Sequence, residues 1–178
     1  MRNNKQAFTV SLIKRTGFVL IGFFLILSAA GAATSGTLNL QGSVPGILDI
    51  TVTPEAGSGS LDLSIDAAGV KVASVTERSN KKAGYTVTLE SANAAAAGGS
   101  VPFFENIDPE IADVLNYQIS YGDTLLTLTG GSATISDVVE KTSGAGNTKD
   151  VFIDYNGATD FPYEGTYTDT LTFTITAK

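Results

Sequence analysis

The residue types that most enzymes use for nucleophilic and metal chemistry are missing from this chain. Its 178 residues contain no cysteine and no histidine. This excludes Ser-His-Asp and Cys-His catalytic arrangements and histidine-rich zinc sites. No phosphate loop of the GxxxxGK type is present either. Paired carboxylates remain possible as catalytic groups, because the chain has 18 acidic residues.

The densest group of carboxylates belongs to Glu105, Asp108, Glu110 and Asp113. A glycosidase needs two carboxylates fixed about 5 Å or about 9 Å apart across a cleft. Nothing in the spacing of these four fixes such a pair, and acids also suit a solvated loop and the start of a helix. We therefore predict that the protein is not an enzyme.

Residues 154–160 place Asp154, Asn156 and Asp160 around Gly157, which resembles part of a calcium loop. The later bidentate glutamate of the EF-hand spacing is absent. Asn156-Gly157 is also a common tight turn. We predict no metal and no other cofactor, and treat weak calcium binding at 154–160 as the less favoured alternative.

The first 32 residues have the pattern of a secretory signal peptide. Four basic residues precede an apolar run at 17–27, and Ala30-Gly31-Ala32 fits an A-x-A cleavage site. An uncleaved anchor is the alternative, but 11 apolar residues are fewer than the roughly 18–20 that span a bilayer. Cleavage after Ala32 is therefore preferred.

Cleavage would leave one acidic, exported domain. All 18 acidic residues but only seven of the 11 basic residues lie beyond Ala32, which makes the formal net charge −11. Such a charge does not favour nucleic acid as a partner. Without cysteine there is neither a disulfide nor a lipidation site, so we expect no direct membrane anchor after cleavage.

The mature chain reads as short strands separated by turns. About ten strands at roughly 8–12-residue spacing predict an all-β sandwich, and no helix is long enough for a parallel α/β fold. We expect the strands at 37–44, 47–53, 61–65, 70–76, 85–91, 116–121, 124–128, 132–136, 149–155 and 165–178. We expect loops at 77–84, 92–100 and 156–164, and one short helical turn within 108–115.

The final segment has the clearest pattern. Threonine occupies every second position from Thr166 to Thr176, and the positions between carry Tyr167, Asp169, Leu171, Phe173 and Ile175. Side chains alternate between the two faces of a strand, so this segment predicts one largely apolar face and one hydroxyl face.

A second alternating segment, 37–44, follows the cleavage site. Leu38, Leu40, Gly42 and Val44 share one side of it. The pattern alone leaves two possibilities open: the first strand of a complete sandwich, or an extension that pairs with another subunit.

These features together resemble the fimbrial subunits of chaperone–usher systems, including cysteine-free, spore-coat-U-like secreted proteins. Gly165 is the fourteenth residue from the end, where pilins typically carry glycine. Tyr167, Leu171, Phe173 and Ile175 match the alternating apolar positions of the pilin terminal strand. Ala177 stands where many pilins have an aromatic residue.

The resemblance implies an immunoglobulin-like β-sandwich that lacks its last strand. A groove beside the terminal strand would receive first a periplasmic chaperone and then the extension of a neighbouring subunit. The implied parts are a signal peptide at 1–32, an extension at 33–45 with donor residues Leu38, Leu40, Gly42 and Val44, and a pilin-like domain at 46–178. The groove residues would be Gly165, Tyr167, Leu171, Phe173 and Ile175.

The implied function is a structural subunit of a bacterial surface fimbria that supports adhesion. Its partners would be copies of itself or related pilins, the periplasmic chaperone and an outer-membrane usher, and it would cross the periplasm on the way to the cell surface. The alternative is a complete, monomeric, secreted sandwich that binds a sugar or a surface partner. Phe103 and Phe104 are the candidate exposed aromatics of that alternative, or else part of the core.

Overall fold

The computed structural model describes residues 34–178 of the chain. The predicted signal peptide at 1–32 lies outside the described residues. Within the described part, no helix is long and apolar enough to cross a membrane. The chain divides into two units, Met1–Gly42 and Ser43–Lys178, and the larger one contains all the regular structure described below.

The larger unit consists of ten strands and two short helices, with the strands dominant. In chain order they are β1 (Leu48–Pro54), β2 (Asp66–Ser79), β3 (Tyr85–Ser91), α1 (Ala92–Ala97), β4 (Phe103–Asn106), β5 (Val114–Tyr121), β6 (Thr124–Leu125), β7 (Ser132–Val138), β8 (Asn147–Asn156), α2 (Gly157–Asp160), β9 (Tyr167–Thr168) and β10 (Leu171–Ala177).

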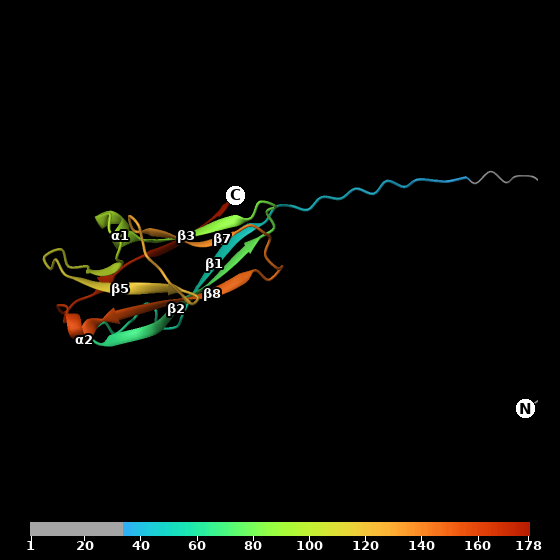
Figure 1. The fold of residues 1–178 in the computed structure, drawn as a ribbon. Helices are drawn as coiled ribbons and strands as arrows, with labels where there is room; N and C mark the ends of the chain where they lie inside the picture. The colour runs from blue at the N-terminus through green and yellow to red at the C-terminus, as the bar shows by residue number, and fades with distance from the viewer. Residues whose placement is uncertain (1–33) are drawn as a thin grey trace, which may run out of the picture. The chain divides into compact units, whose positions relative to one another are not determined.

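The strands form two antiparallel sheets (Figure 1). The larger sheet has the order β1-β2-β8-β5-β4-β9, with β6 paired to β5. The smaller sheet has the order β10-β3-β7. The all-β, sandwich-like expectation is therefore confirmed. Five of the predicted strands appear with small shifts of their ends as β1, β3, β5, β7 and β8.

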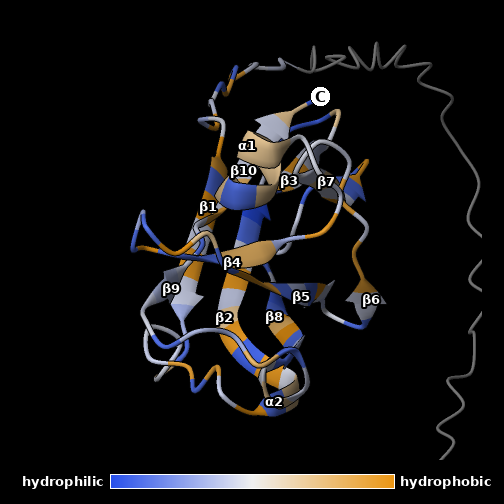
Figure 2. Ribbon diagram, turned by 90° about the vertical axis from the view of Figure 1, so that its left-hand side faces the viewer, coloured by the Kyte–Doolittle hydropathy of each residue, from blue (hydrophilic) through white to orange (hydrophobic). Residues whose placement is uncertain are grey.

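Alternation along the strands builds the core between the sheets. Hydrophobic and hydrophilic residues are interleaved along β2 and β8 (Figure 2). Val75 of β2, Leu89 of β3 and Ile119 of β5 are buried in one cluster with Leu115 and Val151. A period of two therefore supplies each sheet with one apolar face, which is what two packed sheets require.

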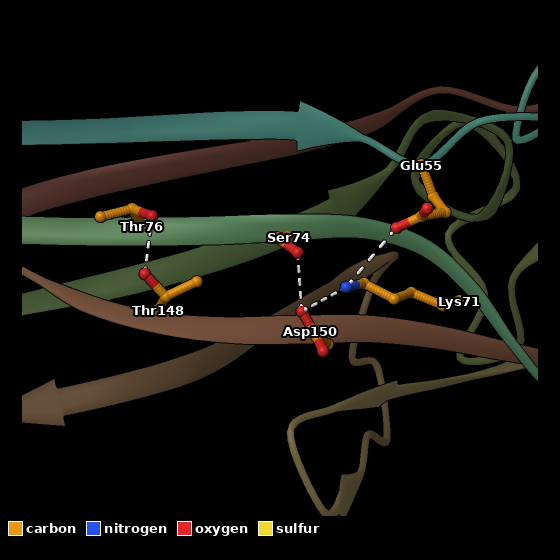
Figure 3. Close-up of polar contacts among 6 residues, drawn as sticks. All are labelled: Glu55, Lys71, Ser74, Thr76, Thr148 and Asp150. Carbon is orange, nitrogen blue, oxygen red and sulfur yellow. Dashed lines mark hydrogen bonds and ion pairs between the residues drawn. The ribbon is translucent and has the colours of Figure 1, made fainter.

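The opposite face of β2 and β8 carries polar pairs (Figure 3). Lys71 Nζ lies 3.1 Å from Asp150 Oδ1 and 3.5 Å from Glu55 Oε2, and Ser74 Oγ donates to the same Asp150 oxygen at 2.7 Å. The hydroxyls of Thr76 and Thr148 are 2.8 Å apart. Such exposed pairs each contribute about 1 kcal/mol or less, and mark this face as solvent-facing.

Residues 92–100 were expected to be a loop, but they contain α1. Ser91 Oγ accepts from Ala94 N at 3.2 Å and so caps the helix N-terminus. Gly98 ends it with φ of 62°, a left-handed conformation that glycine adopts easily. The run of alanines forms a helix despite its short length, because the backbone groups at both ends have local hydrogen-bond partners.

Four other expectations were wrong. Residues 61–65 form a turn rather than a strand, because the Asp62 carboxylate accepts from both N and Oγ of Ser64. Residues 77–79 extend β2 instead of starting a loop, since Glu77 is buried in hydrogen bonds described below. No helix forms in 108–115, where β5 begins at Val114, whereas α2 lies within the expected loop 156–164.

Candidate functional site

The terminal strand is broken in two and changes sheets. β9 pairs with β4, whereas β10 pairs with β3. Asp169 lies at the break, where its carboxylate accepts from Ser91 Oγ at 2.6 Å, Tyr117 Oη at 2.5 Å and Asn93 N at 3.1 Å. These donors explain why an acid occupies a position in the apolar row.

β10 is an edge strand with an unpaired side. Thr170 O accepts from Ala92 N at 3.0 Å, and Lys178 N donates to Gly84 O at 3.3 Å, with regular register between them. In an antiparallel pair, hydrogen-bonded residues alternate with residues whose backbone groups point away. The free N–H and C=O groups therefore belong to the odd positions Leu171, Phe173, Ile175 and Ala177.

The same odd positions of β10 point their side chains inward. Leu171, Phe173 and Ile175 are half-buried, and the threonines between them are exposed. Leu171 and Phe173 pack against the buried core. The unpaired side of β10 thus combines free backbone groups with a partly covered apolar row.

β1 is the matching edge of the larger sheet. Ile47 O accepts from Asn80 N at 3.2 Å, and Glu55 N donates to Val72 O at 2.9 Å, again with regular register between them. The outward backbone groups belong to Leu48, Ile50, Val52 and Pro54. Proline has no N–H to donate, so its position on an unpaired edge costs no ladder bond.

β1 and β10 form what we term the open edge pair. Their Cα atoms approach within 8 Å, yet each strand pairs only with its other neighbour, β2 or β3. Half-buried Leu48 and Ile50 of β1 and the apolar row of β10 belong to this edge pair. Two adjacent edges that share unpaired backbone groups can accept an added strand.

Residues 34–47 have neither helix nor strand in the structure. The side chains of Leu38, Leu40 and Val44 are 81%, 86% and 84% exposed, and an added Cβ at Gly42 would meet no atom within 4 Å. The strand expected at 37–44 is therefore not part of either sheet. The donor role of these residues stays a prediction.

Gly165 and Tyr167 lie before the break, away from the β10 row. A Cβ at Gly165 would come within 2.5 Å of Asn106 Nδ2, so a larger residue at this position would require the Asn106 side chain of β4 to shift. Tyr167 Oη donates to Asp113 Oδ2 and to Tyr163 O, the latter at 2.9 Å. Of the five predicted groove residues, the structure thus brings Leu171, Phe173 and Ile175 together.

Of the two possibilities left open for Phe103 and Phe104, the structure is nearer to the core placement than to the exposed one. Phe103 and Phe104 are half-buried in β4, and the Phe104 ring centroid is 4.5 Å from that of Tyr117. Among residues 34–178 the exposed aromatic side chains are Phe161 and Tyr163, at 88% and 71%. In the sequence, the exposure of these two rings was indicated only by their position in the expected loop 156–164, outside any strand pattern.

The carboxylates singled out earlier are scattered. Asp113 accepts from Tyr163 N and Tyr167 Oη, and these bonds lower the pKa of its carboxyl. Asp108 accepts from Glu110 N, and Asp154 accepts from Gly69 N. Within residues 34–178 no three acids are grouped to hold a metal ion.

One carboxylate, Glu77, is buried between the two sheets. It accepts from Tyr85 Oη at 2.9 Å, Tyr121 Oη at 2.6 Å and Ser136 Oγ at 2.6 Å. Burial and the hydrogen bond to Glu77 raise the pKa of Tyr85 to about 12. We call these four residues the Glu77 network. It links β2 and β5 of the larger sheet to β3 and β7 of the smaller sheet.

No protein-family model matches the chain, and no curated protein matches it. Among solved structures it is similar to the Escherichia coli Hda pilus minor tip subunit, HdaB, with 14% sequence identity. The match covers 71% of this chain and 79% of that one, with a TM-score of 0.37. A score of this size is too low to carry an inference about fold or function.

Proposed function

We propose that the protein is a structural subunit of a surface fibre, in which residues 37–44 of one copy add a strand to the open edge pair of the next. The observation that carries this proposal is the coincidence of unpaired backbone groups and inward apolar side chains on both β1 and β10. A head-to-tail contact of this kind does not close on itself, so it generates filaments.

The direction of the added strand follows from the two edges. Ile47 and Lys178 hydrogen-bond to Asn80 and Gly84, which lie in the same β2–β3 connection, so β1 and β10 run in opposite directions. A strand between them that is antiparallel to β10 is therefore parallel to β1. This is the arrangement of an immunoglobulin-like sandwich completed by its last strand.

Side-chain volume selects a register for that strand. Pairing Gly42 with Phe173 puts the smallest donor residue opposite the largest acceptor ring. The same register pairs Leu40 with Ile175, Val44 with Leu171, and Leu38 with Ala177. Large residues thus face small ones at two of the four pairs, as interdigitated packing requires, and Ala177 leaves room for Leu38.

Insertion also requires the edges to separate. A strand bonded on both sides needs about 9.6 Å between β1 and β10, because neighbouring strands lie about 4.8 Å apart. Some Cα atoms of the edge pair now lie 8 Å or less apart, so the edges must move apart there by at least about 2 Å. A chaperone that holds the edges open before assembly fits this requirement.

Apolar burial alone does not explain a stable fibre. Covering Leu38, Leu40 and Val44 contributes about 5–9 kcal/mol. Association costs about 4–15 kcal/mol. The main-chain ladder to β10 and the repair of its unpaired edge must supply the remainder.

The remaining parts of the proposal rest on the resemblance and on the predicted signal peptide. The chain is exported, meets a periplasmic chaperone and an outer-membrane usher, and reaches the cell surface as a fimbrial subunit that supports adhesion. The subunit has no enzymatic activity and needs no cofactor.

Deletion of residues 33–44 tests the proposal. The shortened mature chain is expected to keep the thermal unfolding midpoint of the monomer, since Leu38, Leu40 and Val44 are exposed. The full mature chain is expected to give a ladder of polymers on an unheated denaturing gel, and the shortened chain is expected to give none. Polymers that persist in the deletion variant would contradict strand addition by this segment.

A complete, monomeric sandwich is the second candidate, favoured by the close approach of β1 and β10. In that case the two edges are already in their final positions. Light scattering of the purified mature protein separates the candidates, because a single monomeric species at all concentrations supports the second one.

A further inference from the structure

A pocket at the end of the sandwich near α2 is independent of the open edge pair. One wall is the loop 58–64, and the other is the segment 161–169. Gly157 holds the loop close, since a Cβ there would come within 1.9 Å of Leu63 O. Tyr155 Oη donates to Asp62 O at 3.0 Å and fixes the loop further. Both walls are therefore tied to the sandwich.

Two aromatic rings at this pocket are held out to solvent. Phe161 and Tyr163 line it, although they rank among the most exposed large side chains of the described chain. Their backbones are fixed: Phe161 N donates to Gly157 O at 3.0 Å, and Tyr163 N donates to Asp113 Oδ2 at 2.8 Å. Rings that bury little surface add little to the stability of the isolated fold, and their fixed backbones reduce the cost of using them in binding.

The backbone of Phe161 is strained as well. Its φ is 49° and its ψ is 59°, and within residues 34–178 it is the only non-glycine residue with positive φ. A bulky side chain is disfavoured in this region. Glycine would relieve the strain at no loss of packing, because the ring is almost fully exposed.

The lining of the pocket is acidic. Asp62, Glu164 and Asp169 line it, and no lysine or arginine does. The Asp169 carboxylate is half-buried and occupied by its hydrogen bonds, whereas Asp62 and Glu164 are exposed and only Oδ1 of Asp62 accepts, from Ser64. Hydrogen bonds from Ser64 lower the pKa of Asp62, so this carboxylate is ionised at neutral pH. The charge of the pocket favours a cation and disfavours an anion.

The inner part of the lining is apolar. Leu61, Leu63 and Phe104 are half-buried there and pack against the core. A strongly hydrated primary ammonium gains little from such surroundings, whereas methyl groups around a nitrogen are compatible with them. Aromatic faces attract cations, and quaternary ammonium groups are recognised in this way.

We propose that this pocket binds a quaternary ammonium group, with Phe161 and Tyr163 as its aromatic contacts and Asp62 and Glu164 as its counter-charges. The ligand class is a trimethylammonium compound such as choline. This site is separate from the residues to which strand addition is assigned.

Ligand-observed saturation-transfer NMR on the mature protein tests the site, with choline as the probe and 3,3-dimethylbutan-1-ol as its neutral counterpart. Choline is expected to bind with a dissociation constant on the order of 1 mM, and the neutral alcohol at least about 5-fold more weakly. Co-sedimentation of the protein with phosphatidylcholine vesicles distinguishes a lipid head group from a soluble ligand. Loss of this co-sedimentation in Phe161→Gly would support the site further.

Variants separate binding from folding. Phe161→Gly and Tyr163→Ala are each expected to weaken choline binding by about 5-fold. Phe161→Gly should not lower the thermal unfolding midpoint, because it removes a strained and exposed residue. Val139→Ala is the matched control, since Val139 is 70% exposed and does not line the pocket.

The proposal is overturned if choline and the neutral alcohol bind equally, or if neither binds at a concentration 10-fold above the expected dissociation constant. It is also overturned if Val139→Ala weakens choline binding as much as Phe161→Gly does. It is also overturned if Phe161→Gly prevents polymer formation, because the rings would then belong to the joint between subunits. Loss of polymers on deletion of 33–44 leaves choline binding unchanged, so the two proposals fail separately.

Discussion

The Glu77 network and the open edge pair differ in whether their polar groups have hydrogen-bond partners. Inside the sandwich, one carboxylate receives three hydroxyl donors from three different strands. Along β1 and β10, alternate N–H and C=O groups have no strand partner within the described residues, although apolar side chains accompany them. The difference is that the Glu77 carboxylate is saturated with hydrogen bonds, whereas β1 and β10, one edge of each sheet, lie next to each other with unpaired backbone groups.

Two adjacent edges of this kind are what the proposed assembly requires. Unpaired edges with an apolar inner row are an aggregation risk unless something covers them. The exposed segment 37–44 supplies the same alternation as β10, and pairing seven of its residues, 38–44, would cover β10 along its whole length. In our proposal the two regions have separate roles: the Glu77 network stabilises the subunit, and the edge pair joins subunits.

The largest expected effect comes from placing a charge in the donor row. Leu40→Asp should abolish polymers, because the carboxylate would be buried opposite Ile175 without a partner. Gln41→Asp is the matched control, since its side chain points to the other face of the added strand. Gel analysis and light scattering measure the outcome, and equal loss in both variants would contradict the assigned faces.

A smaller but still large effect is expected for Glu77→Ala. Removing the carboxylate leaves the hydroxyls of Tyr85, Tyr121 and Ser136 without their acceptor, which should lower the free energy of unfolding by about 3 kcal/mol. Glu77→Gln keeps an acceptor oxygen and should cost less. Denaturant unfolding of the monomeric deletion variant measures both, and the folded full-length protein should still polymerise.

The smallest effect is a dependence on alkaline pH. The pKa of Tyr85 is about 12 in the folded protein, against 10.0 for an ordinary tyrosine. The folded state therefore holds this proton more tightly, so the stability it contributes is complete below pH 10 and is lost as the pH rises toward 12. Tyr85→Phe should show a shallower decline of unfolding free energy over this range. An identical decline would show that Tyr85 does not titrate with folding.

Much of the fold follows from the period of two in the sequence. β3 begins and ends where the alternation of Tyr85, Val87 and Leu89 predicts. The failures are local events that periodicity does not detect. Asp62 turns an alternating segment into a loop by bonding Ser64, and Ser91 and Gly98 cap a helix whose alanines have no apolar period.

The candidate site was predictable in part for the same reason. The alternation of Leu171, Phe173 and Ile175 indicated an inward row, which the structure contains. The break between β9 and β10 at Asp169 could not be predicted, because the hydrogen-bond donors to Asp169 come from residues far away in the chain, such as Tyr117. That β1 is the second open edge depends on which strands pair, and local patterns do not contain this information.

Engineered cysteine pairs test the central claim most directly, since the chain has no cysteine of its own. In the proposed register, Thr174 of one copy lies opposite Gln41 of the next, at a non-hydrogen-bonded pair with Cα atoms about 4.5 Å apart. Mixing a Thr174→Cys chain with a Gln41→Cys chain under oxidising conditions should give a disulfide-linked dimer. Asn39→Cys and Ser43→Cys lie a further two residues away and should link poorly, because diagonal Cα atoms are about 7–8 Å apart. Preferential linkage of Thr174→Cys to either of them would correct the register, and no linkage to any of the three would contradict strand addition to β10.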